Sequence, residues 1–292
     1  MASRQQIKRR IGSVKSTKQI TKAMQLVAAS KLRRAQEAVA GPRAYAELAR
    51  QILARLRKVA GGEAESNLFT VRPVKKRLLI VITSDRGLAG AYNANVVRRM
   101  IKELQQDRDN GVDTSVIVIG RQAANAAGRI SGLTIRAVYQ ELPDRPDANA
   151  LRPILNTVTG LFADGAVDAV DVINTKFIST VSQEVQVRRL LPAGVDAEPD
   201  DSPATESVEA TVEPSVEVLL RSTAMRLLDA QIYQALLEAA ASEHSMRMVA
   251  MKNATDNASD IIDDLTLEYN NARQAAITQE LAEITGGAEA MK

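Results

Sequence analysis

A single stretch of 70 residues, from Val216 to Thr285, contains neither glycine nor proline. Glycine and proline are the residues that most reliably interrupt a helix, so this stretch predicts one continuous α-helix. Pro214 lies just before it and Gly286-Gly287 lies just after it, which is the pattern expected at the start and the end of a helix. At 1.5 Å per residue the helix would be roughly 105 Å long, so few globular domains could bury it along its whole length.

The N-terminal part of the chain has the same character. Residues 13–40 contain no glycine or proline before Gly41-Pro42, and a second helical run is expected from Arg43 to Ala60. In both terminal segments apolar residues recur mostly at spacings of three and four, which predicts one apolar stripe on each helix. The stripes consist of Ile7, Ile11, Val14, Ile20, Met24, Val27, Leu32, Ala35 and Val39 at the N-terminus and of Ile261, Leu265, Tyr269, Ala272, Ala276 and Leu281 at the C-terminus. Such stripes favour a two-stranded coiled coil, and the alternative is that each packs onto a globular body.

The two ends of the chain carry opposite charges. Residues 1–34 contain ten basic residues and no acidic one, whereas the stretch from Asp256 to the C-terminus contains eight acidic residues against Arg273 and Lys292. Opposite charge makes the two terminal helices natural partners. Because a domain between them would return the chain, we expect the two helices to run antiparallel.

The middle of the chain alternates between short β-branched runs and helical stretches. Strands are expected at 77–83, 115–120, 134–139, 168–179 and 184–191, with helices at about 92–106, 121–129 and 147–163. This alternation predicts an α/β domain with a mostly parallel sheet, ending in an antiparallel hairpin. The predicted divisions are an N-terminal helical segment 1–60, a linker 61–75, the α/β domain 76–191, a mobile acidic loop 192–215 and a C-terminal coiled-coil helix 216–292.

The residue types that carry most enzyme chemistry are scarce. The chain has no cysteine and a single histidine, His244, which excludes thiolate metal sites and makes most imidazole-based catalysis difficult. A lone histidine in a helical segment is expected to be packed or solvated. The loop from Ser84 to Asn93 follows the first strand, where nucleotide-binding folds place a phosphate loop, but its glycines form neither phosphate-binding pattern. We therefore expect a tight strand-to-helix turn there, and no catalytic residue, metal or cofactor.

Three motifs stand out along the chain. The first is Ile20-Thr21-Lys22-Ala23-Met24 with the run from Val27 to Ala35, the second is Ser84-Asp85-Arg86-Gly87-Leu88 with Gly90, and the third runs from Ala241 to Ala258 and continues through Tyr269-Asn270 and from Arg273 to Leu281. These motifs resemble those of ATP synthase γ subunits. Because the motifs lie at both ends and in the middle, the resemblance covers the whole chain. It implies the fold of that family, an antiparallel two-helix coiled coil from both termini plus a Rossmann-like α/β domain.

The resemblance also implies a central rotor subunit that performs no catalysis itself. In that family the coiled coil lies inside a ring of three α and three β subunits, while the α/β domain and the foot of the shaft bind the ε subunit and the membrane c-ring. Ion-driven rotation of the c-ring then changes the conformations of the catalytic β subunits. Carried over residue by residue, the contacts with the β catch region would be Met24, Arg247, Gln274, Thr278 and Glu280, with Ile284 in an upper hydrophobic bearing. For Met24 and Thr278 the alternative is packing inside the coiled coil.

The chain departs from the family at Ala89, where many members carry cysteine, and it lacks the plant-type insertion with two cysteines. Thiol-controlled activity is therefore not expected. No apolar run approaches the roughly 18 residues needed to span a bilayer, so direct membrane insertion is not expected either. The resemblance implies a peripheral protein on the cytoplasmic face of a bacterial inner membrane.

Two other classes of function remain open from the residues alone. A soluble nucleotide-binding enzyme would use the α/β domain, although the phosphate-binding patterns are missing. A coiled-coil protein that binds nucleic acid would use the basic residues 1–60, but with eight aromatic residues in the chain stacking platforms are scarce. We expect no nucleic-acid partner.

Overall fold

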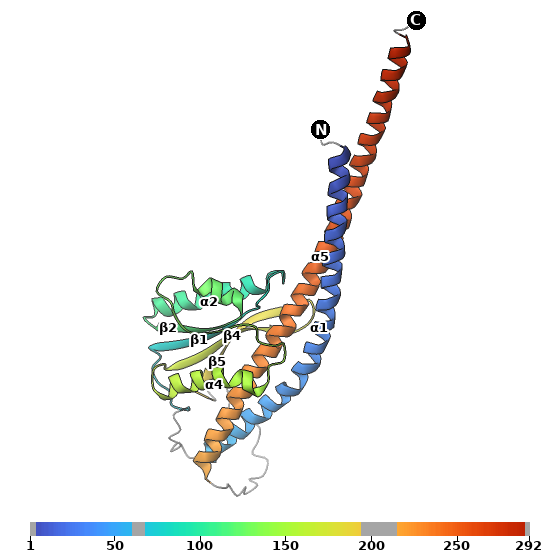
Figure 1. Cartoon of the computed structure of the whole chain (residues 1–292). Helices are drawn as coiled ribbons and strands as arrows, with labels where there is room; N and C mark the ends of the chain where they lie inside the picture. Colours follow the sequence, from blue (N-terminus) through green and yellow to red (C-terminus); the bar gives the residue numbers. More distant parts are fainter. Residues whose placement is uncertain (1–3, 60–67, 194–214, 290–292) are drawn as a thin grey trace. The chain divides into compact units, whose positions relative to one another are not determined.

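The computed structural model describes residues 4–59, 68–193 and 215–289 (Figure 1). The helices are α1 (Arg4–Val59), α2 (Tyr92–Asp109), α3 (Arg121–Ala127), α4 (Ala148–Ala163) and α5 (Val216–Glu289), and the strands are β1 (Lys76–Ile82), β2 (Asp113–Ile119), β3 (Thr134–Tyr139), β4 (Ala169–Phe177) and β5 (Gln183–Leu191). The chain divides into two compact units. The α/β unit is Ser30–Met246, and the coiled-coil unit is Met1–Ala29 with Arg247–Lys292.

The five strands form one sheet in the order β3-β2-β1-β4-β5. β1 pairs in parallel with β2 and β4, β2 pairs in parallel with β3, and β5 is antiparallel to β4. Buried residues form unbroken runs in β1, β2 and β4, as expected for strands that are covered on both faces of the sheet. The predicted α/β fold, its mostly parallel sheet and its final hairpin are confirmed.

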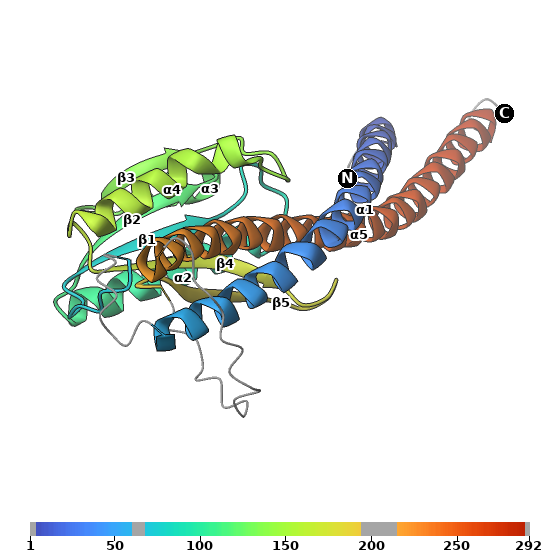
Figure 2. The same ribbon diagram turned by 90° about the horizontal axis from the view of Figure 1, so that it is seen from below.

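Helices cover both faces of the sheet and enclose two apolar cores. Leu78, Ile80 and Ile82 of β1 face α4 and the lower part of α5, which lie side by side on one face of the sheet (Figure 2). Leu79 and Val81 face α2 and α3 on the other side. The α5 residues in the first core are Leu220, Ala224, Leu227, Leu228, Ile232, Ala235, Leu236 and Ala239. The lower part of α5 is therefore a core element of the α/β unit.

Both long helices continue past their predicted ends. α1 runs without interruption through Gly12, Gly41 and Pro42, so the prediction of two N-terminal helical runs was wrong. α5 likewise includes Gly286 and Gly287, which were predicted to end it. A proline removes one helical hydrogen bond and a glycine costs about 1 kcal/mol, and neither ends a helix when the flanking residues favour it.

Several of the predicted segments fall partly outside the described residues. Residues 194–214, most of the predicted acidic loop, lie outside them, as do residues 61–67 of the predicted linker and the last residue of the predicted helical segment 1–60. Next to that gap, Leu68 and Phe69 are buried in the core that α4 and α5 share, and the Ala193 amide donates to the Leu68 carbonyl oxygen at 2.9 Å.

Candidate functional site

In the coiled-coil unit, residues 4–29 of α1 and 247–289 of α5 run antiparallel and side by side (Figure 1). Buried and half-buried residues follow a heptad spacing of alternating threes and fours on each helix. These residues are Ile7, Ile11, Val14, Lys18, Thr21, Gln25 and Ala28 on α1 and Met251, Thr255, Ala258, Ile262, Leu265, Tyr269, Ala272 and Ala276 on α5. The predicted antiparallel coiled coil is thus confirmed.

One hydrogen bond sets the register of the two helices. The Thr255 hydroxyl donates to the Thr21 hydroxyl oxygen at 2.8 Å, and both residues are buried. Because each step forward along α1 is a step back along α5, Ile11 comes level with Leu265 and Val14 with Ile262. The seam positions of the two helices therefore coincide along the whole overlap.

The predicted stripes were wrong in their phase at several positions. Ile20 is 61% exposed and Val27 is 59% exposed, whereas the adjacent Thr21 and Ala28 are buried. On α5, Ile261 is exposed and Ile262 takes the seam position. Polar residues occupy part of the seam, and several large apolar residues lie on the outer surface. Hydrophobicity alone cannot distinguish such exposed apolar residues from buried ones.

α5 extends beyond the start of α1. In the register set by the threonine pair, Arg4 of α1 comes level with Ala272, so residues 273–289 form about 25 Å of single helix. Ile277, Leu281 and Ile284 are all exposed there, the last at 68%, and follow one another at helical spacing. This segment presents an apolar stripe to solvent.

The residues predicted to contact a partner form two groups along the coiled-coil unit. Met24 and Arg247 are half-buried, which leaves both readings of Met24 open, and they lie within two helical turns of one another in this register. Gln274, Thr278, Glu280 and Ile284 are all exposed, about 40–55 Å beyond Arg247 along α5. The Thr278 hydroxyl donates to the Gln274 carbonyl oxygen at 3.0 Å, a bond within the helix, so Thr278 does not pack inside the seam.

The opposite charges of the two ends do not pair directly. Within the described part of the coiled-coil unit, no ion pair joins a basic side chain of α1 to Asp256, Asp260, Asp263, Asp264 or Glu268 of α5. These five acidic residues are exposed, as are Lys8, Lys15 and Lys22 on α1. The charges are therefore on the outer surface, where they can meet other proteins.

The carboxylate of Asp85, in the loop after β1, binds two backbone amides of the same chain. Asp85 accepts hydrogen bonds from the backbone amides of Arg121 at 3.0 Å and Glu141 at 2.9 Å, which follow β2 and β3. An amide at the start of a helix is where phosphate would bind in a nucleotide site. Asp85 therefore fills the anion position at the start of α3 and links the loop after β1 to the ends of β2 and β3, which favours the predicted structural turn.

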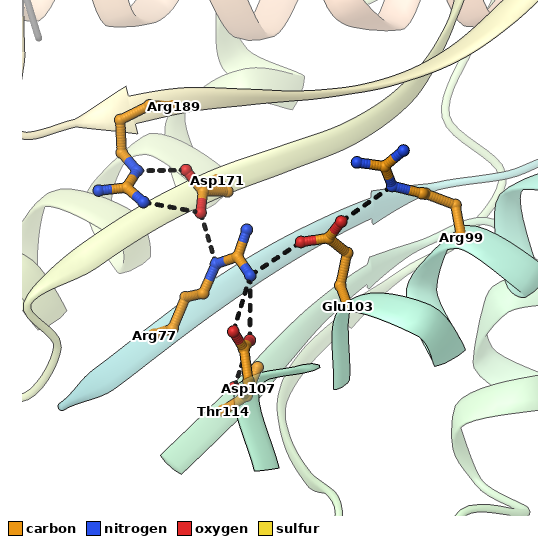
Figure 3. Close-up of polar contacts among 7 residues, drawn as sticks. All are labelled: Arg77, Arg99, Glu103, Asp107, Thr114, Asp171 and Arg189. Atoms are coloured by element: carbon orange, nitrogen blue, oxygen red, sulfur yellow. Dashed lines mark hydrogen bonds and ion pairs between the residues drawn. The ribbon is translucent and has the colours of Figure 1, made fainter. Parts of the chain in front are cut away.

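A buried ion cluster fastens α2 to the sheet (Figure 3). The Arg77 guanidinium donates to Asp171 at 2.5 Å, to Glu103 at 2.9 Å and to Asp107 at 3.0 Å. Arg189 of β5 also binds Asp171. The cluster is completed by Arg99, which binds Glu103, and by Thr114, which donates to Asp107. Burial alone would lower the pKa of Arg77, but Asp171 and Asp107 raise it, so the guanidinium stays charged.

Three arginines and three acids balance one another in this cluster, which gives it a structural role. Sequence reasoning missed it, although one signal was present: Asp171 is the charged residue within the apolar run Ala169–Ile173. Elsewhere, His244 is 2% exposed, as expected for a packed histidine. In the described part of the chain, no group of three or more His, Asp or Glu side chains is arranged to hold a metal ion.

The ATP synthase family model matches residues 3–291. The chain belongs to the family of F-type ATP synthase γ subunits. The resemblance predicted from the sequence is confirmed, and so is the predicted function as a central-stalk rotor subunit.

Solved structures agree with this family. The chain is 25% identical to one in the cryo-EM structure of the Tetrahymena thermophila mitochondrial ATP synthase central stalk and c-ring, with 80% of this chain and 99% of that chain covered and a TM-score of 0.61. A chain in the Euglena gracilis mitochondrial ATP synthase rotor, in rotational state 1, is 19% identical, with 93% and 97% covered and a TM-score of 0.61. The second match supports the fold alone. Among the described residues, no helix is both long enough and apolar enough to cross a bilayer.

Proposed function

We propose that the coiled-coil unit is the shaft of the rotor and that it turns inside a ring of three α and three β subunits around this one chain. The observation that carries this proposal is the end of α5, where Ile277, Leu281 and Ile284 are exposed and no other described segment of the chain covers them. An isolated helical segment of this length is marginal in water, and an exposed apolar stripe usually marks a binding surface. A hydrophobic bearing formed by the surrounding ring would bury the stripe.

The same unit offers a second surface, on α1. Ile20 and Val27 are exposed and seven residues apart, so they lie on one face of the helix, while the basic residues Lys15 and Lys22 are exposed on other faces. Exposed apolar side chains on a basic helix suit a partner surface that combines apolar and acidic groups. We assign the β-subunit catch contacts to Met24 and Arg247 at this level and to Gln274, Thr278 and Glu280 near the tip, and the bearing contact to Ile284.

Rotation of the shaft is coupled to the catalytic sites because the shaft lacks the threefold symmetry of the ring. A rod of two different helices cannot present the same surface to three β subunits, so each rotational position favours a different combination of open and closed catalytic sites. The chain itself supplies no catalytic residue and no cofactor in this proposal. Its contribution is the differential contact free energy between the shaft and each β subunit.

The remaining partners complete the rotor. We propose that the α/β unit and the foot of the helices bind the ε subunit and the membrane c-ring, and that the protein is peripheral on the cytoplasmic face of a bacterial inner membrane. Ion flow through the membrane sector would turn the c-ring and, with it, this chain.

The test is reconstitution with α and β subunits from the same source, followed by native mass spectrometry and ATPase assays. We expect one copy of the chain per three α and three β, with ATPase activity that falls when the residues after Asn271 are deleted. The double variant Leu281→Ser/Ile284→Ser should bind the ring at least about tenfold more weakly, since each buried side chain contributes about 1.5–3 kcal/mol.

The matched control is Gln279→Ser/Glu283→Ser, which changes two polar residues in the same turns of α5. The control should bind like the unaltered chain. Failure of the chain to join any α–β complex, together with nucleotide binding by the isolated chain, would overturn the rotor proposal in favour of a nucleotide-binding enzyme.

A further inference from the structure

Near the end of the α/β unit, the contacts of α5 with the sheet change from apolar to polar. The Ser242 hydroxyl donates to the Thr175 carbonyl oxygen at 3.1 Å, and the Ser245 hydroxyl donates to the Thr180 carbonyl oxygen at 2.8 Å. The Gln183 amide donates to the Ser245 hydroxyl oxygen at 3.2 Å. These partners belong to β4, to β5 and to the turn between them. Directional hydrogen bonds thus tie this part of α5 to the β4–β5 hairpin.

The loop between β3 and α4 reaches both long helices at the same level. The Asp144 carboxylate accepts a hydrogen bond from Lys31 Nζ of α1 at 3.0 Å, and the same oxygen lies 3.2 Å from Nε2 of His244 on α5. The neighbouring Arg145 donates to the Arg34 carbonyl oxygen of α1. Contact with His244 lowers the pKa of Asp144, and Lys31 adds to this against the opposing effect of burial, so the carboxylate is ionised at neutral pH.

The hairpin and the loop hold α5 on different faces. At 3.6 residues per turn, His244 lies about 100° around the helix from Ser245 and about 160° from Ser242. Apolar packing lower on α5 is non-directional and gives little resistance to a small rotation of the helix about its own axis. The hydrogen bonds of Ser242 and Ser245 weaken steeply when their angles change, and the 3.2 Å approach of His244 to Asp144 lies on another face, so the two sets of contacts together resist that rotation.

We propose that Lys31, Asp144, Arg145, Ser242, His244 and Ser245 form a collar that fixes the rotational position of α1 and α5 against the α/β unit. This inference rests on the proposed rotor function and identifies where torque passes from the domain into the two helices. Both helices continue without a break beyond the collar, at Ala29 and Arg247. Torque on the α/β unit is therefore transmitted to α1 and α5 at the same place, the collar, where Asp144 contacts both helices.

The test uses the assembled complex of this chain with three α and three β subunits fixed to a surface. A bead is attached through a single cysteine introduced at Val138, which is exposed on β3, and the chain has no cysteine of its own. While rotation is paused, the variance of the bead angle measures the torsional compliance between the domain and the ring. Asp144→Ala should widen this variance by up to about 1.5-fold, since it removes two of the six polar contacts described above and independent contacts contribute additively.

The matched control is Asp147→Ala in the same loop. Asp147 accepts the Ala150 amide at 2.8 Å and caps α4, so its loss weakens the domain without removing a contact to α1 or α5. The control should leave the angular variance unchanged. Lys31→Ala, at an exposed side chain, provides a second collar variant that does not threaten folding and should widen the variance less than Asp144→Ala.

Equal variances for Asp144→Ala, Lys31→Ala and Asp147→Ala would overturn the collar. That result is distinct from failure of the rotor proposal, in which the unaltered chain would neither join the ring nor turn the bead when ATP is added. If Asp144→Ala does not assemble, the double variant Lys31→Ala/Ser242→Ala decides, since it removes one contact from each helix and keeps the loop.

Discussion

The ion cluster around Arg77 makes the sharpest prediction about stability. Asp171→Asn keeps the shape of the side chain but removes its charge, which leaves three arginines against two acids. Asp171 is 3% exposed and Arg77 is 11% exposed, so water cannot compensate for the lost charge. The amide also places an NH2 group where one carboxylate oxygen now accepts, so a donor would face a guanidinium donor there.

The expected cost is about 3 kcal/mol. Removing one partner of a buried ion pair costs about 3–5 kcal/mol, and the asparagine oxygen retains part of one hydrogen bond. A domain of ordinary stability has about 5–15 kcal/mol in total, so the substitution should remove a large fraction of it.

The assay must report on the sheet, because α1 and α5 dominate the helical signal in circular dichroism. We therefore choose hydrogen exchange measured by mass spectrometry in increasing urea, with the free energy of opening read from peptides of β1 and β4. The matched control is Glu141→Gln, the same chemical change in a pair with Arg121 at 3.1 Å in which the glutamate side chain is 77% exposed. Its expected cost is at most about 1 kcal/mol.

A cost for Asp171→Asn no larger than that for Glu141→Gln would refute the reasoning. It would mean that the cluster is hydrated in solution or that the sheet does not depend on the fastening of α2. A cost near 3 kcal/mol confined to Asp171→Asn would establish the cluster as a main support of the α/β unit.

Two further predictions concern the backbone and the pH dependence of the same unit. Gly120 has φ +94°, and an added Cβ would lie 2.3 Å from the Thr83 carbonyl oxygen. Gly120→Ala should therefore lower the free energy of unfolding, measured in urea, by at least about 2 kcal/mol. The control is Gly132→Ala, at φ +78° with nothing near the added Cβ, which should lower it by about 1 kcal/mol. Burial raises the pKa of Asp229 despite the nearby Arg226, so its contribution to stability is full below the ordinary aspartate pKa and is lost as pH rises through the raised value. Asp229→Asn should therefore raise the urea midpoint at pH 7 and leave it unchanged at pH 3; an equal shift at both pH values would contradict this cause.

The sequence by itself determined the type and order of the secondary-structure elements and the family. The absence of glycine and proline from Val216 to Thr285 favours one long helix, and buried parallel strands appear as continuous apolar runs because both faces are covered. The motifs near Met24, Ser84 and Ala241 carried the family resemblance without any knowledge of contacts.

Only the tertiary structure decided which residues of the coiled coil face inward. Thr21 and Gln25 lie in the seam while Ile20 and Val27 lie outside, and hydrophobicity predicts the reverse. The physical reason is that a residue lies in the seam only where the partner helix faces it. The sequence of one helix does not specify where the partner helix lies. The ion cluster and the collar likewise join residues as far apart as Arg77 and Asp171 or Lys31 and Asp144, pairings that depend on how the chain returns to itself.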